Sequence, residues 1–211
     1  MRKPWFASVL FVLPVLCVAG DVKPVPLPPP QTDGGKPLMQ VLKERRSARE
    51  FSAEKLPPQV LSNLLWAAWG VNRADGRRTA PSASNRQEID VYVAAADGLF
   101  LYDAKAHRLD PVLPDDIRAA TGTQAYPGEA ALNLIYVADY ARMGQSSTED
   151  KGLYAGADTG FISQNVYLYC ASQGLATVVR ASIDRAALAK TMKLRPEQRI
   201  VLAQTVGYPK K

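Results

Sequence analysis

Residues 131–140 read ALNLIYVADY, a nearly continuous apolar run. A run of this kind is typical of a strand that is buried on both faces in the middle of a sheet. Other segments with the pattern of strands stand before and after it, namely EIDVYVAA at 88–95, LATVVRA at 175–181 and RIVLAQTVGYP at 199–209. The sequence therefore predicts a central sheet in which residues 131–140 form an inner strand.

Helical segments surround these strands without a regular strand-helix-strand alternation. Helical spacing of apolar residues, with a proline at the start or a glycine at the end of several segments, predicts helices at 38–45, 58–69, 114–121, 159–174 and 184–194. The stretch GLFLYDAKAHRLDPV at 98–112 predicts a hairpin, with the only histidine, His107, exposed near its tip. We expect a single α+β domain over residues 38–211, with no internal repeat.

The first twenty residues, MRKPWFASVLFVLPVLCVAG, have the order of a signal peptide. A charged start precedes an apolar core and small residues, and the core is shorter than the roughly 20 residues that a stable membrane span needs. We expect export, most simply to a periplasm, with cleavage after Ala19 or Gly20. Lipidation at Cys17 is the alternative, although the bulky Leu16 before it disfavours a lipoprotein signal.

Residues 21–37 are so rich in proline and glycine that we expect neither helix nor sheet, only an extended linker. The formal net charge of +6 falls to +4 if cleavage removes Arg2 and Lys3. This excess is mild, and the basic residues do not alternate with aromatics, so nucleic acid is not an expected partner. Without Cys17 only Cys170 remains, which excludes an intrachain disulfide. A single histidine excludes His-based metal clusters and the usual Ser-His triad.

The stretch LKERRSAREF at 42–51 places Arg45, Arg46 and Arg49 around Ser47. Like charges at this density repel unless something anionic shares the space. One interpretation is a solvated helix end, since cations are favourable near a helix C-terminus. The other is a phosphate site, because guanidinium forks and a hydroxyl supply donors suited to phosphate oxygens.

Four separated stretches resemble, in their order, the FMN-dependent nitroreductase family: RRSAREF, APSASNRQ, SQNVYLYCASQGLATVV and the terminal VGYP. The hairpin GLFLYDAKAHRL looks like the branch of the SagB and thiazole/oxazole-forming dehydrogenases. The resemblance covers nearly all of residues 38–209. It implies a nitroreductase-like α+β fold, with a central, mostly antiparallel sheet flanked by helices, and a homodimer that binds FMN in two clefts at its interface.

The resemblance also implies which residues contact FMN. The first stretch would hold the phosphate, the second would meet the isoalloxazine ring through backbone N–H groups and side-chain amides, and the third would pass its N5 edge. The implied contacts are Arg45, Arg46, Ser47 and Arg49, then Pro81, Ser82, Asn85 and Gln87, and last Val179, Arg180 and Ala181. A charged Arg180 near the reduced ring would raise the reduction potential; the alternative is a surface ion pair with Asp184. Lys210 or Lys211 could replace a basic phosphate ligand that many relatives carry further on.

The function that the resemblance implies is ping-pong hydride transfer from a small donor to a nitroaromatic, quinone or similar acceptor. The flavin does the chemistry, so no catalytic side chain is identified. One alternative is a SagB-like dehydrogenase that oxidises a peptide or heterocycle. That role depends on a Lys-Tyr pair, and here Lys151 and Tyr154 are separated by two residues. The other alternative is a non-catalytic flavin- or anion-binding periplasmic protein.

Overall fold

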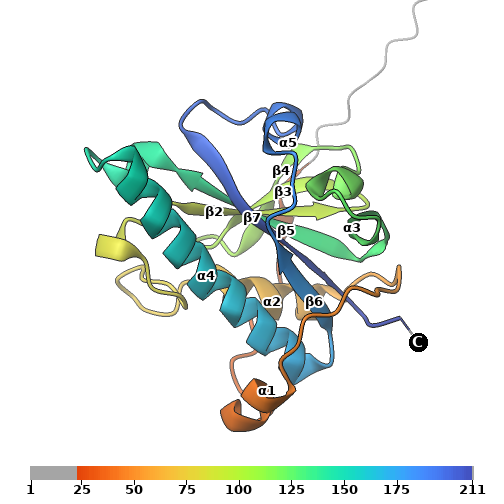
Figure 1. Cartoon of the computed structure of the whole chain (residues 1–211). Coiled ribbons are helices and arrows are strands. Elements are labelled where there is room, and N and C mark those ends of the chain that lie inside the picture. The colour runs from red at the N-terminus through yellow and green to blue at the C-terminus, as the bar shows by residue number, and fades with distance from the viewer. Residues whose placement is uncertain (1–22, 211) are drawn as a thin grey trace, which may run out of the picture.

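Residues 23–210, which this computed structural model describes, form a seven-stranded sheet in the order β1-β4-β3-β2-β5-β7-β6 (Figure 1). Every neighbouring pair in that part of the chain is antiparallel, which confirms the expected fold class. The strands are β1 Val25–Pro26, β2 Ile89–Ala95, β3 Gly98–Asp103, β4 Arg108–Leu113, β5 Leu132–Asp139, β6 Ala176–Arg180 and β7 Gln198–Gly207.

Strand β5 is the inner strand that the apolar run predicts. All eight of its residues are buried, and it pairs along its length with β2 and β7. Its side chains alternate between the two faces of the sheet: Leu134 and Tyr136 join one core cluster, and Ile135 and Val137 join another. Two cores therefore flank one strand, which explains why the sequence shows a continuous apolar run rather than an alternating one.

Helices cover both faces of the sheet. The larger core lies under α2 (Pro58–Trp69) and α4 (Thr148–Gln173), and α5 (Arg185–Thr191) contributes to the core on the other face. The remaining helical elements are α1 Leu38–Glu44, η1 Ala83–Asn85, η2 Arg118–Thr121, α3 Tyr126–Glu129 and η3 Tyr140–Met143. Figure 1 shows α4 running across the part of the sheet formed by β2, β7 and β6, with α1 close to its C-terminal end. No helix among residues 23–210 combines the length and apolarity that crossing a bilayer requires.

Helix α4 begins eleven residues before the predicted start at residue 159. Ser147 caps it, because its side chain accepts a hydrogen bond from the Asp150 N–H, and Asp150 and Glu149 lie in the first turn, where acidic side chains are favourable. The added turns carry Gly152, Gly156 and exposed polar residues. An apolar period could not reveal turns that bury so few large side chains.

The segment 23–37, called the arm below, contacts the domain along much of its length. Val25 and Pro26 pair with β4 as an edge strand, so the prediction of no sheet in this region is wrong at those two residues. Proline is tolerated there because an edge strand needs hydrogen bonds on one side only. The predicted signal segment, residues 1–20, lies outside the described residues, and the domain boundaries themselves stay a prediction.

His107 ends the hairpin turn as predicted, but its predicted exposure is wrong. The side chain is half-buried between Tyr102, whose hydroxyl lies 2.9 Å from Nδ1, and Ser62, whose Oγ lies 2.7 Å from Nε2. Burial lowers the pKa of His107. The arm covers this corner, because the Ser62 hydroxyl donates to the carbonyl oxygen of Pro28, and that cover could not be foreseen from the hairpin pattern.

Candidate functional site

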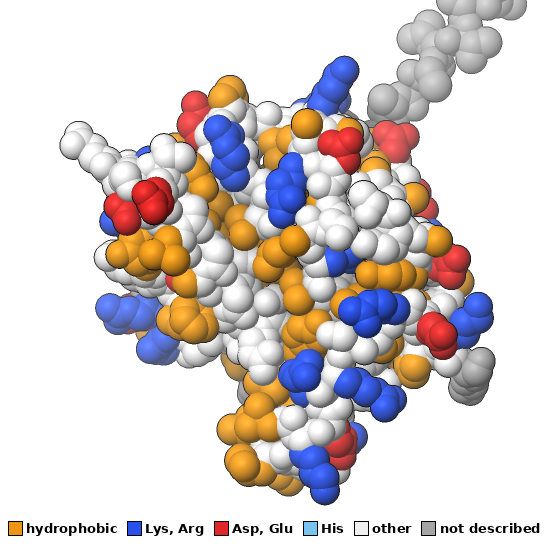
Figure 2. Space-filling model, in the orientation of Figure 1, with side chains coloured by type: hydrophobic (Ala, Val, Ile, Leu, Met, Phe, Trp, Pro, Cys, Tyr) orange, Lys and Arg blue, Asp and Glu red, His pale blue; other side chains and the backbone are white. Residues whose placement is uncertain are grey.

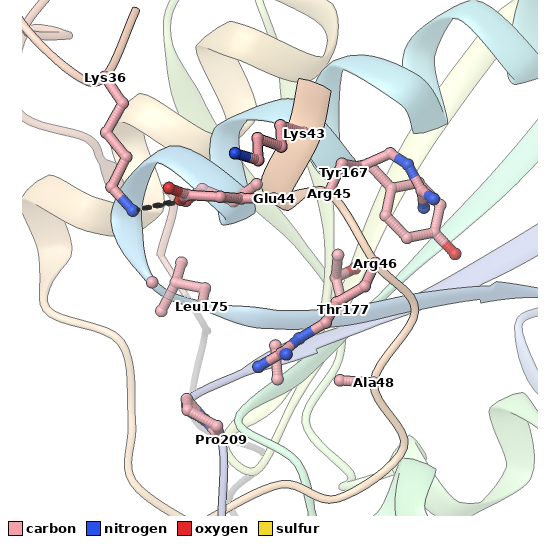
Figure 3. Close-up of a pocket in the computed structure, with 13 residues that line it drawn as sticks. Lys36, Lys43, Glu44, Arg45, Arg46, Ala48, Tyr167, Leu175, Thr177 and Pro209 are labelled. Atoms are coloured by element: carbon pink, nitrogen blue, oxygen red, sulfur yellow. Dashed lines mark hydrogen bonds and ion pairs between the residues drawn. The ribbon is translucent and has the colours of Figure 1, made fainter. Parts of the chain in front are cut away.

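A cavity of about 520 Å³ opens between the end of α1, the C-terminal end of α4 and the start of β6. Four cationic side chains line it (Figure 3): Lys36 from the arm, Lys43 from α1, and Arg45 and Arg46 from the segment that follows α1. We call it the basic cavity. Its other walls are Glu44, Ala48, Tyr167, Ala171, Gly174, Leu175, Ala176, Thr177 and Pro209.

Tyr167 connects two of the predicted stretches at the wall of this cavity. Its hydroxyl lies 2.8 Å from Ser47 Oγ and accepts a hydrogen bond of 3.0 Å from the Val179 N–H. The Arg45 guanidinium lies over its ring, 5.3 Å from the centroid. Tyr167 is not among the residues predicted from the sequence, although it lies inside the stretch SQNVYLYCASQG. A tyrosine at a buried position of the helix was the available signal, because a buried phenol needs a partner for its hydroxyl.

The segment with Arg45 and Ser47 is held beside β6 by its backbone. The Ala48 N–H donates to the Thr177 carbonyl at 2.9 Å, and Phe51 forms an isolated bridge with Pro209. Arg46 points toward Pro209 in Figure 3. Ser47 and Arg49 are exposed and do not line the basic cavity. Of the first stretch, the structure thus places Arg45 and Arg46 at the cavity, and Ser47 at its wall through Tyr167.

Among the described residues that line the basic cavity, Glu44 carries the one carboxylate. Its Oε2 lies 2.6 Å from Lys36 Nζ, and the hydrogen bond from Lys36 lowers the pKa of Glu44. Three cations, Lys43, Arg45 and Arg46, are left in excess of this pair. The cavity is therefore suited to an anion with several oxygens, such as a phosphate.

The second predicted stretch forms a loop, Ser82–Gln87, with unusual backbone geometry. Ser84, Asn85 and Gln87 have φ values of 54°, 53° and 49°. Residues other than glycine rarely adopt this left-handed backbone region. Ser82 Oγ accepts from the Gln87 N–H at 2.8 Å, and Gln87 Nε2 donates to Asn85 Oδ1 at 3.0 Å. A separate hollow of about 380 Å³ lies beside this loop, lined by Pro81, Ser82, Ser84 and Asn85 together with Arg73, Arg77 and Arg78.

Two buried carboxyl groups accept hydrogen bonds from the Ser82–Gln87 loop. Asp158 of α4 accepts the Ala83 N–H at 2.9 Å, and Glu88 accepts the Ser82 hydroxyl at 3.4 Å. Burial, assisted by the Asp158 carboxyl, raises the pKa of Glu88 to about 7. A proton on Glu88 removes the repulsion between the two groups, so the pair holds the strained loop most firmly in its protonated form.

Arg180, from the third stretch, does not lie at the surface, where the alternative prediction of an ion pair with Asp184 would place it. It is buried on the sheet, where Nη2 donates to Thr121 Oγ1 at 2.7 Å and to Asn133 Oδ1 at 3.0 Å. Burial lowers its pKa to about 10. The predicted ion pair with Asp184 is wrong, because the Asp184 side chain caps α5 through the Ala187 N–H. The strand alternation turns Arg180 inward, and no described carboxylate pairs with it.

Within one chain the first and second stretches do not converge. The first is attached to Tyr167 and the second to Asp158, nine positions apart on α4. Nine residues are about 13 Å of helix and two and a half turns, so the two attachments lie on opposite sides of α4. The third stretch joins the first, through Val179. Ala181 is exposed just beyond β6.

The remaining candidates lie elsewhere. Lys151 is near the start of α4, where Nζ donates to the Tyr140 carbonyl at 3.2 Å, and Tyr154 lies under the Arg86 guanidinium, 5.9 Å from the ring centroid. Lys210 follows Pro209 at the edge of the basic cavity, and its N–H donates to the Glu50 carbonyl. Lys211 lies outside the described residues.

Comparison with known proteins adds to this geometry. The model of the family described as "Nitroreductase family" matches residues 42–208. A curated protein of Methanocaldococcus jannaschii, named a "putative nitroreductase", is 32% identical over 151 residues, which are 67% of this chain and 76% of that protein. A crystal structure from Ralstonia eutropha with the same description is 41% identical, with a TM-score of 0.87, over 96% of this chain and 97% of the other.

A more distant structure shares the fold. It is an NADPH:FMN oxidoreductase from Vibrio harveyi, crystallised with NAD⁺, which is 20% identical with a TM-score of 0.62, over 82% of this chain and 69% of that one.

Proposed function

Because the chain belongs to the nitroreductase family, whose members are oxidoreductases, we propose that it is an FMN-dependent oxidoreductase. The observation that carries this proposal is the basic cavity, in which Lys43, Arg45 and Arg46 provide positive charge beyond the Lys36–Glu44 pair. When bound, FMN would accept a hydride at N5 of its ring and pass it on to an acceptor. The protein would bind, orient and enclose it.

The donors around the basic cavity fit the phosphate end of FMN. Arg46 and Lys43 line the cavity from two successive elements, and Arg45 is fixed by its position over the Tyr167 ring. Guanidinium groups can donate two parallel hydrogen bonds to phosphate oxygens, and an ammonium adds a point charge. A dianion between these crowded cations would replace their mutual repulsion with attraction. This favours the phosphate interpretation of residues 45–49 over a solvated helix end.

We propose further that two chains complete each site. The Ser82–Gln87 loop is held on the opposite side of α4 from Tyr167, so a loop from a second copy would have to meet the basic cavity. Exposed apolar side chains on the two helices support such an association: Leu38 is 61% exposed and Met39 76% on α1, and Leu153 is 67% exposed on α4. Figure 2 shows hydrophobic side chains gathered over α1. Apolar surface of this kind marks interaction sites in soluble proteins.

The substrates would be a small electron donor and a nitroaromatic, quinone or similar acceptor, which take turns at the flavin. The signal-like sequence of residues 1–20 supports export, and the donor would then be one that is present outside the cytoplasm.

A dehydrogenase of the SagB type is a second candidate. Tyr154 contacts Arg86, and Arg86 belongs to the Ser82–Gln87 loop, so this tyrosine is close to the proposed second half of the site. Lys151 is directed to Tyr140 instead. A Lys-Tyr function would therefore require Lys151 to leave the Tyr140 carbonyl when substrate binds.

An absorption spectrum of the purified protein before and after denaturation tests the proposal. Flavin bands, with FMN identified by chromatography after release, are the expected result. Donor and acceptor screening, with Lys151→Ala and Tyr154→Phe tested on peptide and heterocycle substrates, then separates the two enzyme roles. Bound FMN that no donor reduces would favour a non-catalytic flavin protein. A colourless protein that binds no added FMN would contradict the proposed function.

A further inference from the structure

The arm contributes one residue, Lys36, to the basic cavity, and nothing in the sequence pattern assigns it a role. Lys36 Nζ lies 2.6 Å from Glu44 Oε2, and both residues line the cavity (Figure 3). Glu44 also accepts a hydrogen bond of 2.8 Å from Gln40 Nε2. The position of Lys36 matters for the proposed function, because Glu44 is the one negative group among the described residues around a site that we assign to a phosphate.

Hydrogen bonds between the arm and the domain hold Lys36 beside Glu44. The arm is fixed at its start by the hydrogen bond of the Leu27 N–H to the His107 carbonyl, and further on by that of the Gln31 N–H to Asn63 Oδ1. The Lys36 N–H itself donates to Ser172 Oγ of α4 at 3.0 Å. A lysine on a free linker would have no such contacts.

Two glycines allow the arm to turn toward the cavity. Gly34 and Gly35 have φ values of +97° and +85°, which residues with a side chain rarely adopt. A Cβ on Gly35 would also lie 2.9 Å from Ser172 Oγ, the atom that accepts the Lys36 N–H. The backbone of this turn is therefore built so that Lys36 approaches α4 closely.

An unpaired Glu44 would oppose the binding of an anion. Its carboxylate lines the same cavity as Lys43, Arg45 and Arg46, and like charges at such short range raise the free energy of the bound state. Lys36 is placed to neutralise it. Lys43, the neighbour of Glu44 in the chain, lowers the pKa of Glu44 less than Lys36 does.

We propose that Lys36 is a positioning residue for cofactor binding: the docked arm holds its ammonium against Glu44, so that the remaining cations of the basic cavity face the phosphate without a competing carboxylate. This inference rests on the proposed function, since it concerns the phosphate of FMN. It makes the proline-rich arm part of the binding site rather than a passive linker.

The experiment is a double-mutant cycle on FMN affinity, measured by quenching of flavin fluorescence with apoprotein. Lys36→Gln should weaken FMN binding by about threefold to fivefold, the upper end expected for an exposed ion pair. Glu44→Gln should bind FMN at least as tightly as the natural protein. The double variant should return to within about 1.5-fold of the natural affinity, because the carboxylate that Lys36 neutralises is then gone.

Three controls separate the charge effect from damage to the fold. Lys55→Gln removes an exposed lysine that pairs with Asp97 away from the cavity, and it should leave FMN affinity unchanged. Riboflavin, which lacks the phosphate, should bind the natural protein and Lys36→Gln equally. Thermal unfolding midpoints check that each variant is folded.

The outcomes for the two proposals are distinct. If the natural protein binds no FMN, the proposed function fails. If it binds FMN but Lys36→Gln behaves like Lys55→Gln, the inference about Lys36 is overturned and the proposed function stands. The inference also fails if Glu44→Gln does not restore the affinity that Lys36→Gln loses, or if riboflavin binding falls equally, because the arm would then act only through the fold.

Discussion

The two halves of the candidate site are built in different ways. At the basic cavity, ordinary backbone brings Lys43, Arg45 and Arg46 to one site, and their positive charge stays in excess because the one carboxylate among the described lining residues, Glu44, is paired with Lys36. At the Ser82–Gln87 loop, three residues adopt strained backbone, and the buried carboxyl groups of Glu88 and Asp158 hold it. One half therefore offers excess positive charge to a ligand, whereas the other holds a loop in a strained backbone conformation.

The largest effect should come from removing charge at the basic cavity. The double variant Arg45→Ala/Arg46→Ala should weaken FMN binding by roughly 100-fold or more, because each charge-assisted hydrogen bond contributes about 1.5 to 3 kcal/mol. Isothermal titration with FMN measures this. Arg73→Ala/Arg77→Ala is the matched control, because these arginines line the hollow beside the loop. It tests whether arginines at that hollow contribute to FMN affinity as much as those at the basic cavity. Equal losses of FMN affinity in the two double variants would contradict the assignment of the phosphate to the basic cavity alone.

Removing the hydroxyl that joins the first and third stretches should have the next largest effect. Tyr167→Phe leaves the Val179 N–H and Ser47 without their partner, at a cost of about 2 kcal/mol in the free energy of unfolding. Urea unfolding measures it. Tyr169→Phe is the control, because the Tyr169 hydroxyl donates to the Val60 carbonyl of α2 at 3.2 Å and so lies outside the contact between the first and third stretches. The prediction is wrong if Tyr167→Phe is no less stable than the control.

A smaller effect is expected in the loop. Ser82→Ala removes the oxygen that accepts the Gln87 N–H and contacts Glu88, and should lower the free energy of unfolding by about 1 kcal/mol. Binding of inorganic phosphate at the basic cavity should not change, because the loop is on the other side of α4. Ser84→Ala, at an exposed residue of the same loop, is the control. A weaker phosphate affinity in Ser82→Ala would show that the halves are coupled within one chain.

A further prediction concerns pH. The pKa of Glu88 is raised from 4.5 to about 7 in the folded protein, so the folded state binds more protons than the unfolded state between these values. Its contribution to stability is therefore complete below about pH 4.5 and is lost as the pH rises toward 7. Glu88→Gln, which keeps a neutral side chain of the same shape, should lose less stability between pH 5 and pH 8. Urea unfolding at both pH values measures this, and identical losses in the two proteins would contradict the raised pKa of Glu88.

Local sequence patterns predicted much of the fold. The period of apolar residues and the positions of proline and glycine located α2 and β5, because those signals depend on neighbours in the chain. The early turns of α4 and the edge strand at Val25 were missed. Their stability comes from contacts with distant segments and from a polar cap rather than from an apolar period.

The site shows the same division. The sequence could predict that Arg45 and Arg46, which line the basic cavity, belong to one dense basic stretch with Ser47, because charge density and residue order are properties of the sequence. Tyr167, Lys36 and the buried pair of Glu88 with Asp158 could not, because each is defined by a partner far away in the chain. The burial of the Arg180 side chain could not be predicted either, because it depends on which face of β6 the rest of the fold covers.

The sequence by itself determined the order of the elements, the central strand and the presence of a dense basic stretch, since these follow from composition and spacing along the chain. Only the tertiary structure decided that the arm brings Lys36 against Glu44, that Arg180 is buried away from Asp184, and that the Ser82–Gln87 loop lies on the opposite side of α4 from the basic cavity. The physical reason is that charge neutralisation, burial and backbone strain depend on distances in space between segments that the chain separates by tens of residues.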